Sequence, residues 1–477
     1  MKNYKNIYLQ HNNLKIVIVN PPYQYISPKS NIVNYNRPPL GILYLAAYVE
    51  NKLGIQVDIL DAYAKNMSLT DVTEMLIRDR YNIIGFSVTT PTCDFVKNIS
   101  YQLKKHNPEV FLVAGGPHVT LFPDALINDV DCTVFGEGEI TFCEIINYLM
   151  GYRDDYQIAG TIFRINNNII KNQPREFQDK LDEFPFPDRN KIADNNYGHI
   201  FSYGIKPKHF TTLMTSRGCP YDCYFCANRG LWGKHVRKRT VNNVIEEIKL
   251  LLRQDYKLIF FDDDDLMEDT QYLTLLCETI LKENIKFKWI CHAKIAQYKL
   301  DLIHLMSRAG CVEVQIGVES FNQNALDAVN KKIKADYIHE CIKNFQNHKI
   351  NIWATIIIGL PTESKISFKE TIKKLIKAKP FYATFIMLFP FPGTKIYQIY
   401  REKGFILKHE YHNYSWHQEP VFFTDQLTFK DLLDLRRYAY RKFYLRPSRL
   451  IKYIFYAIQY SAYHDILLNF LRFLRLE

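Results

Sequence analysis

The chain has 477 residues, of which 47% are hydrophobic and 23% are charged, so its composition is that of a globular protein rather than a disordered one. At about 150 residues per domain, this length predicts about three domains and excludes a single small module. The 61 Lys and Arg residues outnumber the 50 Asp and Glu residues, for a formal net charge of +11. The basic residues are scattered apart from one dense run at 234–239, so we interpret them as a solvated surface and expect no nucleic-acid partner.

Neither a secretory leader nor a membrane span is expected. The first residues lack an apolar central stretch, and no segment reaches the roughly 18 uninterrupted apolar residues of a spanning helix. We therefore expect a cytoplasmic protein, in a compartment where thiols stay reduced. The ten cysteines are too few for a disulfide scaffold, so those that matter are expected to bind metal or to take part in redox chemistry.

Strand-like and helix-like patterns alternate between residues 14 and 150. Apolar residues at helical spacing, as in 40–54, separate short apolar runs. This alternation predicts a parallel, doubly wound sheet, which binds ligands at the carboxyl ends of its strands. Five strands are expected, at 14–22, 56–62, 81–90, 109–118 and 131–139.

Turn residues and glycines follow four of these five strands. Glycine there lets the backbone approach a large flat ligand closely, although ordinary turn chemistry is the alternative for any one of them. The first strand ends in Asn-Pro-Pro rather than GxGxxG, so a dinucleotide is not expected. The candidate ligand-contact residues at these strand ends are Pro22, Ser87, Gly115, Gly116, Gly136, Glu137 and Gly138.

Residues 151–205 have a different character and are interpreted as a connector between domains. They are rich in asparagine and contain proline. A small hairpin is expected at 158–171, with Asn166 to Asn168 as its turn.

Three of the ten cysteines lie within eight residues, in the sequence SRGCPYDCYFCANRG. Cys219, Cys223 and Cys226 have the spacing CxxxCxxC, directly after a strand-like run at 210–216. A structural zinc site normally uses four ligands, and no second cysteine pair follows at zinc-finger spacing. Three thiolates on one loop can instead hold three irons of a [4Fe-4S] cluster and leave the fourth iron open to a small molecule. The alternatives are a zinc site with a distant fourth ligand and unligated cysteines.

This motif, with Phe225 just before its last cysteine, resembles the radical S-adenosylmethionine superfamily. The resemblance implies that Cys219, Cys223 and Cys226 are catalytic cluster ligands, that S-adenosylmethionine binds the open iron, and that Phe225 lies beside this cofactor. It also implies one-electron cleavage of S-adenosylmethionine to a 5′-deoxyadenosyl radical, which takes a hydrogen atom from the substrate. An electron donor such as flavodoxin or ferredoxin is implied as a partner.

Six strand–helix units are predicted between residues 206 and 400, which matches the partial (βα)6 TIM-type barrel of that superfamily. Parallel barrels carry their chemistry at the carboxyl ends of the strands. An FxDDxΦ pattern ends the second predicted strand, within a run of four aspartates for which a divalent metal site is the alternative. A structural turn role is the alternative for the other strand ends. The resemblance places the contacts to S-adenosylmethionine at Asp263, Asp264, Glu319, Ser320, Gly359 and Pro361.

The other seven cysteines occur singly in strand or helix patterns. They are interpreted as small buried hydrophobic residues, and no second cluster motif is present. These residues are Cys93, Cys132, Cys143, Cys277, Cys291, Cys311 and Cys341.

A doubly wound domain before such a barrel resembles the cobalamin-binding half of cobalamin-dependent radical S-adenosylmethionine enzymes. The sequences NPP, RPPLGILYLAAY, GGPH and FGEGE carry this resemblance, which adds Leu40 to the predicted cofactor contacts. The DxHxxG loop, whose histidine ligates cobalt from below, is absent, and His118 does not fit that pattern. Many members of the subfamily also lack that histidine, so cobalamin is expected without a protein ligand, with an empty or repurposed domain as the alternative.

The expected fold class is therefore α/β. The chain is expected to contain four parts in order: a Rossmann-like cobalamin-binding domain (1–150), a connector (151–205), a partial barrel (206–400) and a helical extension (401–477). The resemblance implies transfer of a methyl group, through cobalamin, to an unactivated carbon of a small-molecule or lipid-like substrate. Two alternatives remain open, a cobalamin-using radical cyclase, oxidase or rearrangement enzyme without methyl transfer and a cobalamin or iron–sulfur sensor.

The extension at 401–477 shows two helical stretches that are broken near Pro447. Their mixture of aromatic and basic residues fits a bundle that caps the barrel. It also fits an interfacial helix that contacts a membrane or a lipid-like substrate.

Overall fold

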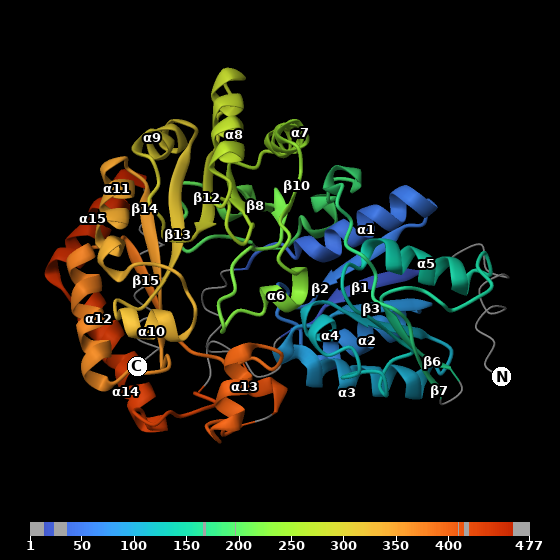
Figure 1. The fold of residues 1–477 in the computed structure, drawn as a ribbon. Helices are drawn as coiled ribbons and strands as arrows, with labels where there is room; N and C mark the ends of the chain where they lie inside the picture. The colour runs from blue at the N-terminus through green and yellow to red at the C-terminus, as the bar shows by residue number, and fades with distance from the viewer. Residues whose placement is uncertain are drawn as a thin grey trace. The chain divides into compact units, whose positions relative to one another are not determined.

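A computed structural model gives the fold and groups the chain by its contacts into two compact units (Figure 1). The first unit contains the described residues up to 22, with 38–195 and 410–414, and the second contains the others. The residues that the structure describes are 14–22, 36–165, 168–195, 197–408, 410–414 and 419–460.

The first unit is built on a seven-stranded sheet of order β2-β1-β3-β4-β5-β6-β7, in which the first five strands are parallel. The doubly wound sheet predicted from the sequence is confirmed. The strands are β1 (Ile16–Asn20), β2 (Val57–Asp61), β3 (Ile83–Ser87), β4 (Phe111–Gly115) and β5 (Cys132–Val134). The helices between them are α1 (Leu40–Leu53), α2 (Leu69–Asp79), α3 (Cys93–His106), α4 (Pro117–Leu121) and α5 (Glu139–Leu149).

Apolar side chains cover both faces of this sheet, which explains why its strands read as continuous apolar runs. In β1, Ile16 and Ile18 join one core with residues of α1 and α5, whereas Val17 and Val19 join the opposite core with residues of α2 and α3. Successive residues of a strand point to opposite faces. One short run of five residues therefore supplies both cores.

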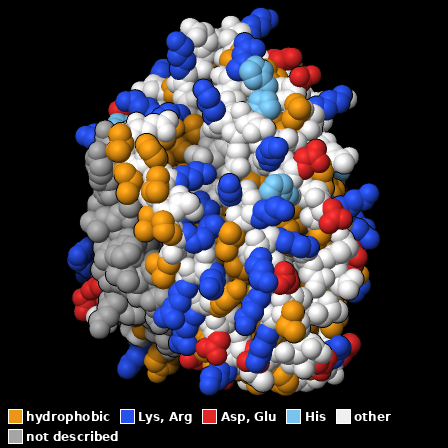
Figure 2. Space-filling model, turned by 90° about the vertical axis from the view of Figure 1, so that its left-hand side faces the viewer, with side chains coloured by type: hydrophobic (Ala, Val, Ile, Leu, Met, Phe, Trp, Pro, Cys, Tyr) orange, Lys and Arg blue, Asp and Glu red, His pale blue; other side chains and the backbone are white. Residues whose placement is uncertain are grey.

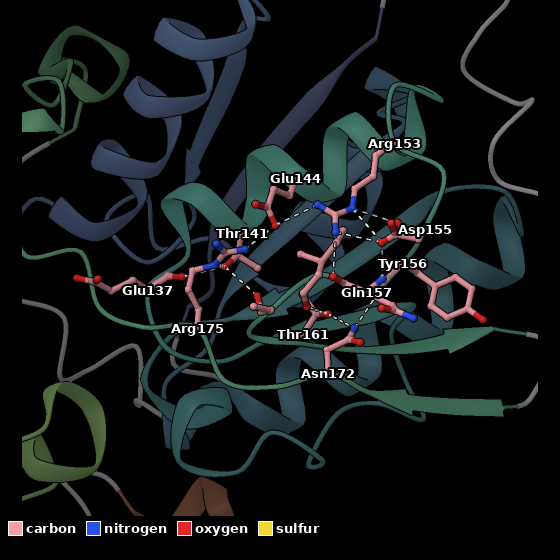
Figure 3. Close-up of polar contacts among 12 residues, drawn as sticks. Glu137, Thr141, Glu144, Arg153, Asp155, Tyr156, Gln157, Thr161, Asn172 and Arg175 are labelled. Atoms are coloured by element: carbon pink, nitrogen blue, oxygen red, sulfur yellow. Dashed lines mark hydrogen bonds and ion pairs between the residues drawn. The ribbon is translucent and has the colours of Figure 1, made fainter.

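A hairpin of β6 (Thr161–Ile165) and β7 (Asn168–Lys171) extends the same sheet, because β6 pairs antiparallel with β5. The predicted hairpin is confirmed, but Asn168, predicted to lie in its turn, is the first residue of β7 and pairs with Ile165. Asn166 and Asn167 of the predicted turn lie outside the described residues. Polar contacts around the hairpin are drawn in Figure 3. There Arg175 contacts Thr141 and Glu144 of α5, and so ties the chain after β7 to that helix.

The second unit contains a six-stranded parallel sheet of order β8-β11-β12-β13-β14-β15, whose two end strands do not pair with each other. This is the incomplete barrel predicted from the sequence. Its strands are β8 (Phe210–Leu213), β11 (Leu258–Phe261), β12 (Lys288–Ala293), β13 (Cys311–Glu319), β14 (Asn351–Ile358) and β15 (Tyr382–Met387). Its helices include α7 (Val241–Arg253), α8 (Thr270–Lys282), α9 (Leu300–Arg308), α10 (Gln323–Ala328), α11 (Ile338–Asn347), α12 (Lys365–Ala378) and α13 (Lys395–Glu402).

The amino-terminal end of the barrel is filled by the chain that leads into it. His199 Nε2 lies 2.9 Å from one carboxylate oxygen of Glu313, near the start of β13, and the Tyr203 hydroxyl donates to the other at 2.6 Å. All three side chains are buried, and the His199 ring lies among aromatic rings of the barrel wall, including that of Trp353. A ligand therefore has to approach this unit from the carboxyl ends of the strands.

Two helices follow the barrel, α14 (Phe429–Tyr444) and α15 (Pro447–Tyr460). The predicted helical extension is confirmed for these residues, with the break at Pro447, the first residue of α15. Proline suits a first helical turn, where its missing N–H is not needed. The part of the predicted extension after residue 460 lies outside the described residues.

Candidate functional site

The three-cysteine motif forms a loop at the carboxyl end of β8, as the sequence predicts. The two-residue strands β9 (Ser216–Arg217) and β10 (Arg237–Lys238) pair antiparallel and close the base of this loop. Gly218 starts the loop with φ +108°, and a Cβ at this position would collide with the His235 carbonyl oxygen. Only glycine fits both the left-handed backbone and this close approach.

Cys219, Cys223 and Cys226 are free thiols, and each is half-buried. A turn in which the Cys226 N–H donates to the Cys223 carbonyl oxygen at 3.0 Å brings the last two close in the loop. Burial raises the pKa of the Cys219 thiol to about 11 and that of Cys226 to about 12. The loop therefore offers three thiols that must lose their protons when a metal binds.

The donor set fits an iron–sulfur cluster in kind, because soft thiolates are the ligands that such clusters use. Within the described ranges, no three His, Cys, Asp or Glu side chains already lie close enough together to hold a metal ion. The three thiols share one clamped loop, and Cys223 and Cys219 add to the effect of burial in raising the pKa of the Cys226 thiol, so they are already neighbours.

Two lysines that the sequence analysis did not single out lie beside the cysteine loop. Lys331 Nζ lies 5.7 Å from the centre of the Phe225 ring, and Lys294 Nζ lies 3.4 Å from the centre of the Tyr221 ring. Burial raises the pKa of the Cys223 thiol, and both lysines partly offset that effect. Positive charge at this place favours the thiolate form that a metal requires. Neither lysine belongs to a recognisable motif, so the linear sequence gives no signal for them.

Asp263, a predicted contact of S-adenosylmethionine, is fully buried and bound to the strand before the cysteine loop. Its carboxylate accepts the Thr215 N–H at 3.1 Å, the Thr215 hydroxyl at 2.8 Å and the Ser216 hydroxyl at 2.5 Å. Its acceptor positions are therefore used within the protein. These bonds join the end of β11 to the start of the cysteine loop and give Asp263 a positioning role.

The neighbouring aspartates divide into an open pair and a buried pair. Asp262 and Asp264 are half-buried, whereas Asp263 and Asp265 are buried. The Asp264 carboxylate accepts a hydrogen bond from the Asn228 amide at 2.5 Å, and burial raises its pKa to about 6. Asp264 thus stays available as the predicted contact at this strand end.

The two predicted residues that end β13 have different surroundings. Glu319 is buried with φ +60°, and its carboxylate lies 2.7 Å from Lys331 Nζ. Ser320 is fully buried, and its hydroxyl lies 3.1 Å from that of Thr371 in α12. The Ser320 hydroxyl is therefore hydrogen-bonded within the protein. Of the residues at this strand end, the Glu319–Lys331 ion pair therefore supplies the charged groups.

The segment after β14 is held by close packing. Gly359 has φ +87°, and a Cβ there would lie 2.6 Å from the Phe422 ring and 2.9 Å from the Leu432 side chain. Its carbonyl oxygen accepts the Tyr400 hydroxyl at 3.0 Å. Pro361 is half-buried. These contacts explain the glycine by packing, and the predicted contact with a cofactor stays a prediction for both residues.

Arg37 is a further charged residue of the barrel interior that the sequence analysis did not select. Its guanidinium pairs with Asp262 and lies 3.9 Å over the Phe260 ring. It also lies 3.4 Å from His292 Nε2 on β12. Arg37 is the first residue of the marker RPPLGILYLAAY, so its membership of that marker was the available signal.

The predicted ligand residues of the first unit gather at the carboxyl edge of its parallel strands. Ser87 pairs with Gly115 in adjacent strands, and Gly116 follows so closely that a Cβ there would lie 2.8 Å from the Val88 nitrogen. Pro22 lies just after β1 and is buried. The strand order reverses between β1 and β3, which is where open sheets of this type bind ligands. Pro22 and Ser87 therefore flank the expected crevice.

The other predicted residues lie where α1 and α5 begin. Leu40 starts α1, and a Cβ at Gly138, before α5, would lie 3.0 Å from Leu45 of α1. Gly136 faces open space with φ +82°. Glu137 is buried and accepts the Gln178 backbone N–H at 2.8 Å, so its carboxylate is used within the fold.

Two helices that start at this edge, α1 and α5, have no side-chain cap on their first turn. By contrast, α2 has a full capping box made by Ser68 and Asp71. Uncapped helix starts leave backbone N–H groups available to a ligand. This observation fits a polar cofactor at this edge.

His118 does not face that edge as a free ligand. It is fully buried, with its ring 4.5 Å from that of Tyr411 and 5.3 Å from that of Phe122, and burial lowers its pKa to about 4. Its Nδ1 lies 3.3 Å from the Thr90 hydroxyl. The His118 imidazole is therefore covered by protein side chains in this unit.

Comparison with known families identifies both halves of this arrangement. A model described as the B12 binding domain matches residues 32–146, and one described as the radical SAM superfamily matches residues 213–375.

Two relatives align along most of the chain. One is an uncharacterized methyltransferase of Pyrococcus horikoshii, 29% identical over 446 residues, which are 93% of this chain and 95% of the relative. The other is the anaerobic magnesium-protoporphyrin IX monomethyl ester cyclase of Rubrivivax gelatinosus, 25% identical over 92% of this chain and 78% of the cyclase.

Solved structures share the fold. OxsB, a cobalamin-dependent S-adenosylmethionine radical enzyme solved with aqua-cobalamin and S-adenosylmethionine bound, has a TM-score of 0.71 and 17% identity over 97% of this chain and 72% of its own. TsrM of Kitasatospora setae, solved with cobalamin and a [4Fe-4S] cluster bound, has a TM-score of 0.66 and 16% identity over 82% of this chain and 75% of its own. At these low identities, the structural similarity is evidence for the fold alone.

Proposed function

The chain is a radical SAM enzyme that carries a B12-binding domain, and from this premise we propose that it transfers a methyl group to an unactivated carbon of a small-molecule or lipid-like substrate. The observation that carries the proposal is the joint presence of a clamped three-thiol loop at the mouth of an open barrel and of a ligand edge on a doubly wound sheet. The methyltransferase relative aligns over 95% of its length, which favours methyl transfer.

The fit to the cofactors rests on residues already described. Cys219, Cys223 and Cys226 would hold a [4Fe-4S] cluster, and the edge formed by Ser87 and Gly115 would hold cobalamin. When bound, the cluster supplies an electron, S-adenosylmethionine supplies the radical precursor and the methyl group, and cobalamin carries that group. An electron donor such as flavodoxin or ferredoxin would reduce the cluster.

The protein's own residues position these groups. Asp263 fixes the start of the cysteine loop to β11, so the thiols are presented at one place on the barrel mouth. Asp264 offers a carboxylate to a positively charged group such as an amino group. Glu319 and Lys331 form a buried pair that places one negative and one positive charge near Phe225.

The proposed compartment is the cytoplasm. All ten cysteines are free thiols in the structure, which fits a reducing environment. Among the residues that the structure describes, no helix is both long and apolar enough to cross a membrane.

The test uses the full chain, reconstituted anaerobically with iron, sulfide and cobalamin. We expect the reduced enzyme to cleave S-adenosylmethionine to 5′-deoxyadenosine, and Cys223→Ala to lose both iron and this product. Cys143→Ala, which changes a buried cysteine of the first unit, is the matched control and is expected to keep them. Product formation by Cys223→Ala at the wild-type rate would refute the scheme.

A second candidate, a radical cyclase without methyl transfer, is favoured by the alignment of the magnesium-protoporphyrin IX monomethyl ester cyclase over 92% of this chain. Incubation with S-adenosylmethionine labelled in its methyl group separates the two. A labelled product together with S-adenosylhomocysteine supports methyl transfer, and 5′-deoxyadenosine with an unlabelled product supports the cyclase.

A further inference from the structure

Helix α15 is attached to the barrel by one of its two faces. Buried Arg449 donates from Nη1 to the carbonyl oxygens of Pro380 at 2.7 Å and Phe381 at 2.8 Å. The Tyr453 hydroxyl donates to the Phe381 carbonyl oxygen at 3.2 Å, and the Tyr456 hydroxyl accepts the Tyr203 N–H at 2.9 Å. This inner face fixes the helix against the amino-terminal end of the barrel.

The opposite face of α15 is apolar and open to solvent. Five large hydrophobic side chains on it are between 49% and 67% exposed, although burial is the usual fate of such side chains. Their spacing of i, i+1, i+4, i+5 and i+8 places them on one helical stripe. They are Leu450, Ile451, Ile454, Phe455 and Ile458.

The helices that neighbour α15 are rich in basic residues. α14 packs on α12, and the Arg449 guanidinium of α15 lies 4.3 Å over the Phe443 ring of α14. The sequences of α12, α14 and α15 contain twelve Lys and Arg residues against three Asp and Glu residues. Their net charge of +9 accounts for most of the +11 of the whole chain. Figure 2 shows hydrophobic side chains gathered beside many Lys and Arg side chains on the face that lies to the left in Figure 1, where α12 and α15 are labelled.

The three acidic residues of these helices do not interrupt the positive field. Each is paired with a basic residue of the same face: Glu370 with Lys373 at 2.5 Å, Asp431 with Lys365 at 2.7 Å and Asp434 with Arg437 at 3.5 Å. α15 itself contains no acidic residue. Arg449 is buried on the inner face, so the surface presents an apolar stripe beside an excess of eight positive charges, from eleven basic and three acidic residues.

We propose that this face, formed by α15 with the outer sides of α12 and α14, binds the surface of an anionic lipid bilayer. An amphipathic helix lies in the plane of a bilayer interface with its apolar side among the acyl chains and its basic neighbours at the headgroups. Charge complementarity selects this occupant. A second copy of the chain packed on the same face would set +8 against +8, which opposes association. Phosphates of a nucleic acid would leave the apolar stripe unused.

The experiment is co-sedimentation of the full chain with vesicles. Vesicles of phosphatidylglycerol and phosphatidylcholine are compared with vesicles of phosphatidylcholine alone, at low and high salt. We expect binding to the anionic vesicles only, weakened by salt because the charge contribution is screened.

Two variants separate the apolar and the electrostatic contributions. Phe455→Glu is expected to lower the vesicle partition coefficient at least about tenfold, because it places a charge in the stripe. The triple variant Lys373→Gln, Lys374→Gln and Lys377→Gln is expected to lower it about 100-fold, since each lysine near an anionic surface contributes about fivefold.

Matched controls change similar groups elsewhere on the chain. Leu275→Glu alters a side chain of α8 that is 54% exposed, and Lys65→Gln, Lys105→Gln and Lys282→Gln remove three other exposed lysines. These controls are expected to bind vesicles like the wild type, and all variants to show the wild-type thermal melt.

Equal binding to both kinds of vesicle, or wild-type binding by Phe455→Glu, would overturn the proposal. Light scattering supplies a further check. A concentration-dependent dimer that Phe455→Glu abolishes, without any vesicle binding, would show that the stripe serves a second copy and would also overturn it. Neither outcome bears on the cysteine loop or on methyl transfer.

Discussion

Asp263 gives the most direct test of how the cysteine loop is positioned. Its carboxylate Oδ1 accepts the Thr215 N–H and the hydroxyls of Thr215 and Ser216, all in a buried place. Asp263→Ala would leave three buried donors unpaired. Each costs about 1–3 kcal/mol, so we expect a loss of about 3–5 kcal/mol after local relaxation. Asp263→Asn keeps Oδ1 as an acceptor and is expected to cost about 1–2 kcal/mol.

The assay measures thermal stability, iron content after anaerobic reconstitution, and the KM for S-adenosylmethionine. Asp263→Ala is expected to lower the melting temperature and the iron content together, with Asp263→Asn in between. Asp264→Asn, at the neighbouring half-buried position, is expected to raise the KM for S-adenosylmethionine and to keep the iron. Full iron content in Asp263→Ala with only the KM changed would refute the positioning role and make Asp263 a cofactor contact.

Three further predictions follow from buried groups. Gly359→Ala is expected to lower the free energy of unfolding by about 3 kcal/mol, because it combines a left-handed φ with a clash against a packed ring. Gly54→Ala, with φ +67° and open space around it, is expected to lower it by about 1 kcal/mol. Denaturant unfolding measures both values. Burial raises the pKa of Glu363 from its ordinary value of 4.5 to about 8, so stability is expected to fall as the pH rises through this interval, and thermal melts of Glu363→Gln should lose that dependence. Breaking the buried Glu319–Lys331 pair with Lys331→Met is expected to cost about 3–5 kcal/mol, and a double-mutant cycle with Glu319→Gln should recover part of it; additive losses would contradict a direct interaction.

The sequence was sufficient to predict the order of strands and helices, because each buried strand is an apolar run and each helix has apolar spacing. Six barrel strands and five sheet strands form where the pattern indicates them. The cysteine loop was predictable because CxxxCxxC keeps all its donors in one short segment. Local patterns of this kind need no knowledge of distant contacts.

Side chains that meet through the fold could not be found in this way. Lys331 lies more than one hundred residues after Cys223, and only the turn after α10 brings it beside the cysteine loop. Arg37 reaches Asp262 across 225 residues of sequence. Such pairs depend on tertiary contacts between elements, and the periodicity of the sequence does not reveal these contacts.

The four aspartates after β11 show what the alternation of side chains along an extended chain could predict. Successive residues of an extended chain point to opposite sides, so Asp262 and Asp264 share one side and Asp263 and Asp265 the other. The burial of the four side chains follows this alternation, since the even-numbered pair is half-buried and the odd-numbered pair is buried, although the chain bends at Asp264. A buried carboxylate must find donors, and the nearest are the backbone and hydroxyls at the end of the adjacent strand β8. The positioning role of Asp263 and the availability of Asp264 therefore follow from strand geometry and from the pairing of β11 with β8, and the second of these is a property of the barrel rather than of the local sequence.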